Sequence, residues 1–140
     1  MRNILPGFAM AMVALAMLTA CESDNATLLT DGLWTFKDMS TDSNESAIIS
    51  LVSLGEALLT GATLEFQEGG TYILNSALVE DPTFGQWELI GDDQLVLEPD
   101  GEAPSTSRIV ILTKEKLSYS EGFLDAQQNS YAVTTTWARN

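Results

Sequence analysis

Apolar and polar residues alternate along much of this 140-residue chain, in short segments that are separated by turn-forming residues. The alternation is clearest in residues 32–39 and 129–137, where Trp34 and Phe36, and then Tyr131 and Val133, occupy every second position. A period of two is that of a β-strand with one buried face and one solvent-facing face. The chain is therefore predicted to be mainly β.

Eight segments are predicted to be strands: residues 32–39, 62–67, 71–78, 85–90, 94–98, 107–112, 117–120 and 129–137. Turn signals such as Glu68-Gly69-Gly70 and Gly91-Asp92-Asp93 separate neighbouring strands and are typical of hairpins. Eight short strands in hairpin order favour an antiparallel up-and-down barrel over a sandwich, because closure removes the unpaired sheet edges.

One segment, Ser46–Leu59, repeats its apolar residues near helical spacing instead. Asn44 or Ser46 is the expected N-cap, and Gly61 follows the expected end of the helix. We expect this single helix to lie between the first two strands, where it covers one mouth of the barrel. It would be a lid in a ligand-binding protein, or a packed plug in a filled barrel.

The N-terminus has the features of a secretory signal, namely Arg2, an apolar stretch over residues 8–18, and small residues before Cys21. The apolar stretch is far shorter than the roughly 20 residues that a membrane-spanning helix needs. Leu18-Thr19-Ala20-Cys21 resembles the lipobox of bacterial lipoproteins, which implies acylation of Cys21 and cleavage before it. The alternative is ordinary secretion with a free cysteine. We predict a signal peptide over residues 1–20, a lipid-anchored polar tether over 21–30 and the barrel over 31–140.

A chain that begins at Cys21 is strongly acidic, because it keeps all 20 acidic side chains and only five basic ones. This charge argues against binding to nucleic acid or to anionic lipid. The resemblance to lipoproteins implies anchoring at the bacterial outer membrane, since Glu22 is not the aspartate associated with inner-membrane retention. The choice between the periplasmic and the surface leaflet stays open.

Four short motifs follow one another along the predicted strands: Gly32-Leu33-Trp34, residues 64–72, Gly85-Gln86-Trp87 and Leu95-Val96-Leu97. In this order they resemble the lipocalin-like domains of bacterial lipoproteins. The resemblance covers nearly all of residues 28–140 and implies a calycin-type barrel closed at one end by Trp34. It also makes Arg139 the candidate for a cation–π contact with Trp34, the alternative being a solvated terminal arginine. The chain departs from secreted lipocalins in having no disulfide pair and no helix after the last strand.

Strand parity predicts that several large rings point into the barrel. An eight-stranded barrel is either just filled by side chains or holds one small ligand. Two functions therefore stay open: a carrier of a small apolar or amphipathic molecule, with tyrosine hydroxyls as polar anchors, and a structural module that contacts an envelope protein. The candidate ligand-binding residues are Phe36, Phe66, Tyr72, Trp87, Tyr119 and Tyr131, and Trp137 shares their face.

Signatures of catalysis are lacking in the sequence. The chain contains no histidine, no Gly-x-Ser-x-Gly motif and no phosphate-binding loop. The acidic pairs Glu80-Asp81 and Asp92-Asp93 lie in turns, where solvated carboxylates are common. Residues 38–45 offer oxygen ligands of the kind that calcium prefers, but their spacing does not match an EF-hand loop. We predict that the chain is not an enzyme and that it has no cofactor and no metal site.

Overall fold

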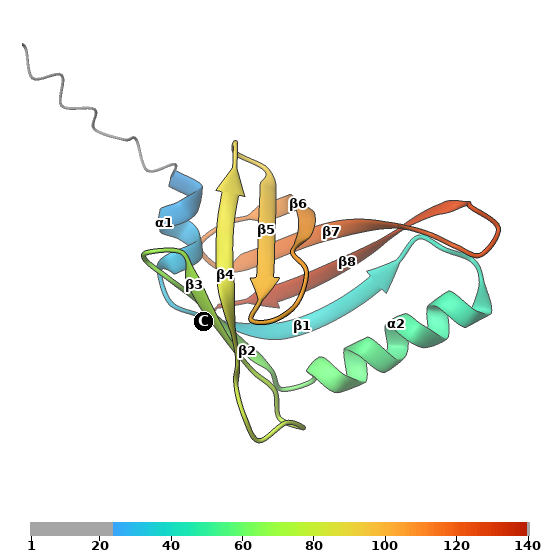
Figure 1. Ribbon diagram of the computed structural model, residues 1–140, viewed down its shortest axis with the longest axis horizontal. Coiled ribbons are helices and arrows are strands. Elements are labelled where there is room, and N and C mark those ends of the chain that lie inside the picture. The colour runs from blue at the N-terminus through green and yellow to red at the C-terminus, as the bar shows by residue number, and fades with distance from the viewer. Residues whose placement is uncertain (1–23, 140) are drawn as a thin grey trace, which may run out of the picture.

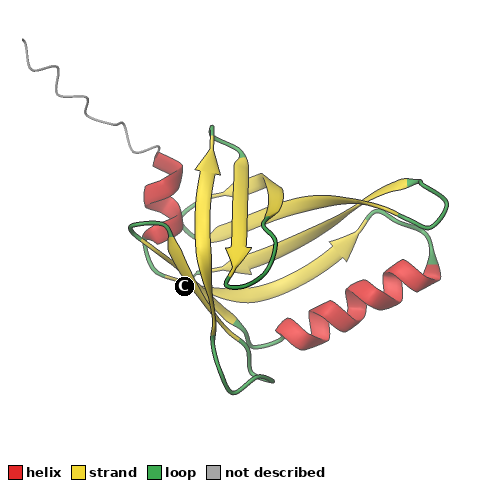
Figure 2. Ribbon diagram, viewed as in Figure 1, coloured by secondary structure: helices red, strands yellow, loops and turns green. Residues whose placement is uncertain are grey.

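The computed structural model describes residues 24–139, which form a closed barrel of eight antiparallel strands and two helices (Figures 1 and 2). Each strand pairs with the next along the chain, and β8 pairs with β1 to close the barrel. The predicted fold class is therefore confirmed, and the predicted signal peptide and Cys21 lie outside the described residues. The elements are α1 (Asp24–Thr30), β1 (Leu33–Thr41), α2 (Ser46–Leu59), β2 (Thr63–Gln67), β3 (Thr71–Asn75), β4 (Thr83–Ile90), β5 (Gln94–Pro99), β6 (Ser105–Leu112), β7 (Lys116–Leu124) and β8 (Ser130–Ala138).

The core of the barrel consists of the inward-facing residues of neighbouring strands. Trp34 lies opposite Leu64 in the β1–β2 pair, and Leu117 lies opposite Trp137 in the β7–β8 pair. All four side chains are buried, as are Phe66, Leu95 and Leu29. Burial of each such side chain contributes roughly 1.5–3 kcal/mol, so this cluster is the main source of stability in a fold for which the sequence predicts no disulfide.

Helix α1 replaces part of the tether that the sequence predicted over residues 21–30. That prediction is wrong for Asp24–Thr30, which forms a helix whose Leu29 is fully buried in the barrel core. A seven-residue helix is unstable alone in water, so its stability comes from tertiary contacts. Asn25 Nδ2 donates a hydrogen bond of 2.7 Å to the Asp92 carbonyl in the β4–β5 turn. α1 thus fills the barrel mouth at which the β4–β5 turn lies.

Helix α2 spans the predicted residues, Ser46–Leu59, and Gly61 follows it with a φ of 79°. The predicted N-cap is wrong: the N-cap is Glu45, which makes no side-chain capping bond, while its backbone N–H donates to Ser43 Oγ. The helix packs along β1 through the buried Ile48. Gly55 allows this close approach, because a Cβ at that position would lie 3.1 Å from Met39 Sδ.

The β7–β8 hairpin is longer than the sequence predicted. β7 continues four residues beyond Ser120 to Leu124, and its register with β8 runs unbroken to Ser130. Figure 1 shows this hairpin projecting beyond strands β4–β6, with the end of β1 and α2 beside it. α1 and α2 lie at opposite ends of the molecule (Figures 1 and 2). Within residues 24–139, no helix is long and apolar enough to cross a membrane.

Candidate functional site

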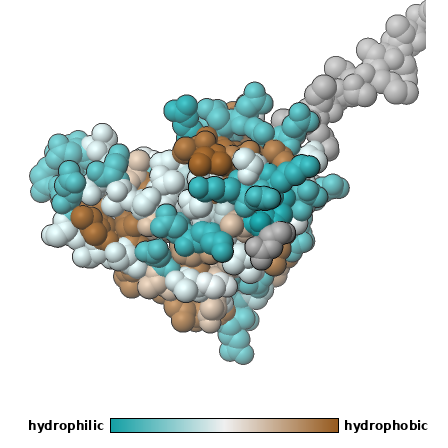
Figure 3. Space-filling model, turned by 180° about the vertical axis from the view of Figure 1, so that it is seen from behind, coloured by the Kyte–Doolittle hydropathy of each residue, from teal (hydrophilic) through white to brown (hydrophobic). Residues whose placement is uncertain are grey.

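A cleft of about 290 Å³ opens between α2 and the inner face of the β7–β8 hairpin. The helix lines it with Ile48, Leu51 and Val52, and β1 adds Met39. Ile48 is buried, whereas Leu51 is 65% exposed at the outer edge of the helix. Seen from behind, apolar surface gathers on the side of the molecule that carries the hairpin, below its hydrophilic tip (left in Figure 3). One wall of the cleft is therefore entirely aliphatic or thioether.

The opposite wall comes from alternate residues of the two hairpin strands. β7 contributes Tyr119, Glu121 and Phe123, and β8 contributes their cross-strand partners. The rings of Phe123 and Tyr131 stack with centroids 5.6 Å apart and planes inclined by 24°. The partners in register are Thr135 for Tyr119, Val133 for Glu121 and Tyr131 for Phe123.

The Tyr119 phenol is a polar group at the inner end of the cleft. Its oxygen accepts a hydrogen bond of 3.2 Å from Trp137 Nε1, which ties it to the filled core. Burial raises the pKa of Tyr119 to about 12, an effect that the Trp137 hydrogen bond partly offsets. The phenol therefore stays neutral at physiological pH and keeps its own proton.

Glu121 is the one charged side chain among the residues that line the cleft. It is half-buried, and burial raises the pKa of its carboxyl. Within the described part of the chain it has neither an ion-pair partner nor a hydrogen-bond partner. The other titratable groups on the cleft wall are the phenols of Tyr119 and Tyr131. A carboxylate thus faces an otherwise neutral and mostly apolar cavity.

Acidic side chains also stand where α2 begins and where the hairpin turns. A hydrogen bond between the carboxyls of Glu45 and Asp125 raises the pKa of Glu45. Asp42 Oδ1 accepts a hydrogen bond of 2.7 Å from the Ala132 backbone N–H, and Thr41 Oγ1 donates to the carbonyl of the same residue. These contacts hold the loop before α2 against β8, so they fix the position of the helix relative to the hairpin.

The structure places the six predicted ligand-binding residues in two groups. Tyr119 and Tyr131 line the cleft. Phe36, Phe66 and Tyr72 belong to the packed core instead. Trp87 lies on that core in an edge-to-face contact with Phe66, and its Nε1 donates to the Gln67 carbonyl. The barrel is therefore filled at the α1 end, and the cleft lies at the α2 end.

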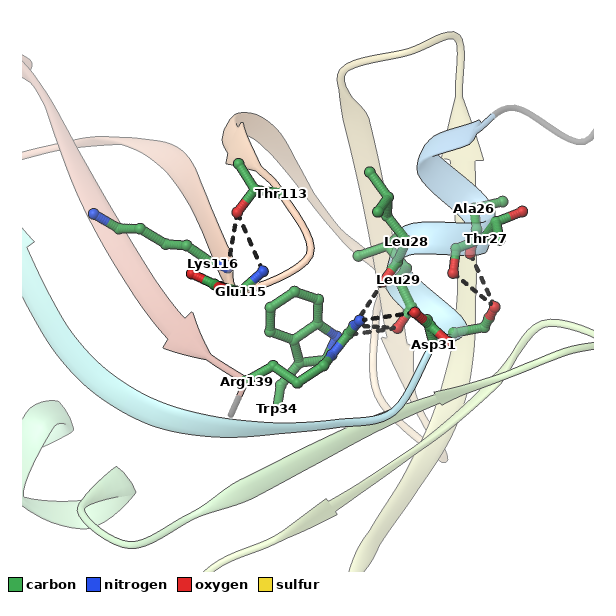
Figure 4. A network of polar contacts seen from close by, with 11 residues as sticks. Ala26, Thr27, Leu28, Leu29, Asp31, Trp34, Thr113, Glu115, Lys116 and Arg139 are labelled. Carbon is green, nitrogen blue, oxygen red and sulfur yellow. Dashed lines mark hydrogen bonds and ion pairs between the residues drawn. The ribbon is translucent and has the colours of Figure 1, made fainter.

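Trp34 and Arg139, the pair expected from the lipocalin-like resemblance, close the α1 end of the barrel (Figure 4). The Arg139 guanidinium carbon lies 3.8 Å from the centroid of the Trp34 ring, so the predicted contact is present. Arg139 Nη2 donates a 2.6 Å hydrogen bond to the Leu28 carbonyl, and Trp34 Nε1 donates to the Leu29 carbonyl at 3.0 Å. Both side chains thus satisfy carbonyls in the last turn of α1, which would otherwise be unpaired. Desolvation lowers the pKa of Arg139, and the nearby Asp31 carboxylate opposes that shift.

Sequence reasoning missed most of the cleft. The sequence predicts that Ser46–Leu59 covers one mouth of the barrel, but it does not indicate which residues of this helix face inward. The helix side of the cleft is therefore not predicted. Glu121 and Phe123 were missed because the predicted strand ended at Ser120. Continuing the alternation from Tyr119 would have placed both on the inner face, so the signal was present in the spacing. Among residues 24–139, no group of three or more acidic, cysteine or histidine side chains is arranged to hold a metal ion.

Comparisons with known proteins support the fold. No protein-family model matches the chain, and no curated protein matches its sequence. The chain is similar to the crystal structure of a DUF4847 family protein from Bacteroides vulgatus, with a TM-score of 0.52 and 12% sequence identity. The match covers 81% of this chain and 96% of the other. At this identity the likeness concerns the fold alone.

Proposed function

We propose that this protein is a lipid-anchored envelope protein whose lipocalin-like barrel binds a small apolar or amphipathic molecule in the cleft beside α2. The observation that carries the proposal is the cleft itself. Its volume of about 290 Å³ is close to the lower end of the roughly 300–1,000 Å³ that small-molecule sites occupy. Its walls are apolar except for a few polar groups, which is the usual composition of such sites.

The position of the cleft agrees with this function. The core at the α1 end is packed, and Tyr119 marks the boundary between the packed and the open half through its bond to Trp137. An apolar chain in the cleft would cover Phe123 and Leu51, which are 39% and 65% exposed. Each square ångström of apolar surface removed from water contributes about 25 cal/mol, so burial of these side chains favours binding.

The anchor would leave the cleft accessible. In the sequence, only Glu22 and Ser23 separate Cys21 from the first residue of α1, and two or three residues span about 10 Å at most. An acylated Cys21 would therefore hold the α1 end next to the membrane. The cleft lies beside α2. Figure 1 shows α2 at the end of the molecule opposite α1. A ligand would then enter from the aqueous side.

The presence of a bound ligand is tested with the full chain purified in a mild detergent. Mass spectrometry of an organic extract is expected to find small amphiphiles that are released when the protein is denatured. Val133→Trp fills the cleft and should abolish their retention, whereas Val110→Trp, at a strand position that is 58% exposed and outside the cleft, should not. Equal retention by both variants, or an empty extract from the unaltered chain, would argue against ligand binding.

Anchoring is tested separately by cell fractionation. Cys21→Ser removes the only thiol in the chain, so the variant is expected to leave the membrane fraction. A variant that still sediments with the outer membrane would contradict the lipid anchor.

A second candidate function, contact with an envelope protein, is favoured by the exposed leucines of α2, one of which, Leu51, also borders the cleft. Leu51, Leu54 and Leu58 recur at spacings of three and four and are 65%, 57% and 50% exposed. A row of leucines at this spacing suits packing against another helix. Leu54→Glu changes this row without changing a cleft residue. Loss of a cross-linked envelope protein in this variant, with ligand retention unchanged, would support the second function.

A further inference from the structure

Glu121 is out of place on the inner face of an apolar cleft. Strand alternation puts it between Tyr119 and Phe123, and its cross-strand partner is Val133. A half-buried carboxylate loses part of its hydration, and this loss is ordinarily offset by an ion pair or by hydrogen bonds. Within residues 24–139, Glu121 has neither. The fold therefore keeps an unpaired negative group facing an otherwise neutral cavity.

No lysine or arginine is among the residues that line the cleft. Lys37 on β1 and Lys116 on β7 are exposed, and Arg108 on β6 pairs with Asp93 instead. The sequence has no lysine or arginine between Lys37 and Arg108, or between Lys116 and Arg139. These two stretches contain the whole of α2, the cleft face of β7 and the whole of β8. The nearby charged groups at the end of the hairpin, Glu45 and Asp125, are also acidic. A ligand in the cleft thus meets one acidic side chain and no basic one among the lining residues.

From this arrangement we infer that the cleft selects amphiphiles with a cationic polar end, such as an alkylamine, and that Glu121 is the residue that pairs with the ammonium group. The inference rests on the proposed ligand-binding function and narrows its ligand class. An ammonium group supplies the partner that Glu121 lacks, while the alkyl chain lies against α2 and Phe123. An alkyl carboxylate of equal length would bring a second negative charge into the same partly desolvated space.

Three photoreactive probes of equal chain length test this selectivity: a diazirine-bearing alkylamine, the matching alcohol and the matching carboxylic acid. Each is applied to membranes that contain the full chain, and mass spectrometry measures labelling of the peptides from β7 and β8. The amine is expected to label these peptides about tenfold more than the acid, with the alcohol between them, because a partly desolvated ion pair is worth about one factor of ten in affinity.

Glu121→Gln is the decisive variant, because it keeps the shape of the side chain and removes its charge. The amine-to-acid ratio should fall to about one in this variant. Glu65→Gln, which removes the same charge from an exposed position on β2, should leave the ratio unchanged. Partition of the probes into the membrane is the same for all three proteins, so it cancels in the comparison.

The outcomes separate the two proposals. Labelling of the cleft by the alcohol without a preference for the amine would overturn the cationic selectivity and leave ligand binding standing. A preference that survives Glu121→Gln would overturn the role of Glu121. Absence of cleft labelling by all three probes would overturn ligand binding, and the selectivity with it.

Discussion

Replacement of Arg139 by methionine should destabilise the barrel by releasing α1. Its side chain is 10% exposed, and the guanidinium lies 3.8 Å from the centroid of the Trp34 ring. A desolvated cation–π contact contributes about 1–2 kcal/mol. The 2.6 Å hydrogen bond to the Leu28 carbonyl is a charged one, of a kind that contributes about 1.5–3 kcal/mol.

Two effects reduce the sum of these contributions. The guanidinium atoms Nε and Nη1 are buried without hydrogen-bond partners, so desolvation of the charge opposes the favourable contacts. The Asp31 ion pair adds little, because its atoms are 3.9 Å apart and the Asp31 side chain is 69% exposed. Methionine also keeps most of the packing of the arginine stem. We expect Arg139→Met to lower the free energy of unfolding by about 2 kcal/mol.

Urea unfolding of the full chain, followed by tryptophan fluorescence, measures this loss. Arg108→Met is the matched control, since that arginine is largely exposed and pairs with an exposed Asp93 at 3.5 Å, a contact worth less than about 1 kcal/mol. Amide hydrogen exchange should also accelerate first in Asp24–Thr30, whose last-turn carbonyls lose their donor. Equal stability losses in the two variants, or unchanged exchange in α1, would contradict a role for Arg139 in holding α1 on the barrel.

Two further substitutions probe the cleft and the core. Because burial raises the pKa of Glu121, the folded chain binds that proton more tightly than the unfolded chain, and stability falls as pH rises through the interval from the ordinary to the raised pKa. Glu121→Gln should therefore raise the urea midpoint at pH 7. This gain in stability should disappear below about pH 4, where the Glu121 carboxyl is protonated in both the folded and the unfolded chain. A gain of the same size at all pH values would contradict an origin in the Glu121 charge. Gly85→Ala should cost about 2–3 kcal/mol in the same assay, because its Cβ would lie 2.5 Å from both the Glu98 carbonyl oxygen and the buried Tyr72 ring. Gly122→Ala is its control, since a Cβ there has no neighbour within 4 Å, and equal losses from both alanines would contradict the steric account.

Much of the fold was predictable because its signals are local. The hairpin turns, such as Gly69-Gly70 and Gly91, carry positive φ angles that glycine adopts readily, and they separate strands of the expected period. Ser46–Leu59 was predictable because its apolar spacing changes and a glycine follows it. The end of β7 was harder to predict, because Glu121-Gly122 resembles a break although the alternation from Tyr119 to Phe123 continues across it.

The candidate site was only partly predictable. Parity identified inward-facing rings, and all seven are buried or partly buried. The alternation along a strand does not indicate how far along the barrel axis a side chain lies, because that position depends on the stagger of the strands. Phe66 and Tyr72 lie in the filled half for this reason, while Tyr131 lines the cleft.

The mainly β class, the order of the strands, the limits of α2 and the acidic charge follow from the amino-acid sequence, because each depends on residues close together in the chain. Three features emerge from the packing of the folded chain: Asp24–Thr30 is a helix, the barrel is filled at the α1 end with a cleft at the α2 end, and Glu121 faces that cleft unpaired. These features depend on contacts between segments as distant as Leu28 and Arg139. Periodicity specifies which side of a strand a residue faces, and the packing of the closed barrel specifies what it meets there.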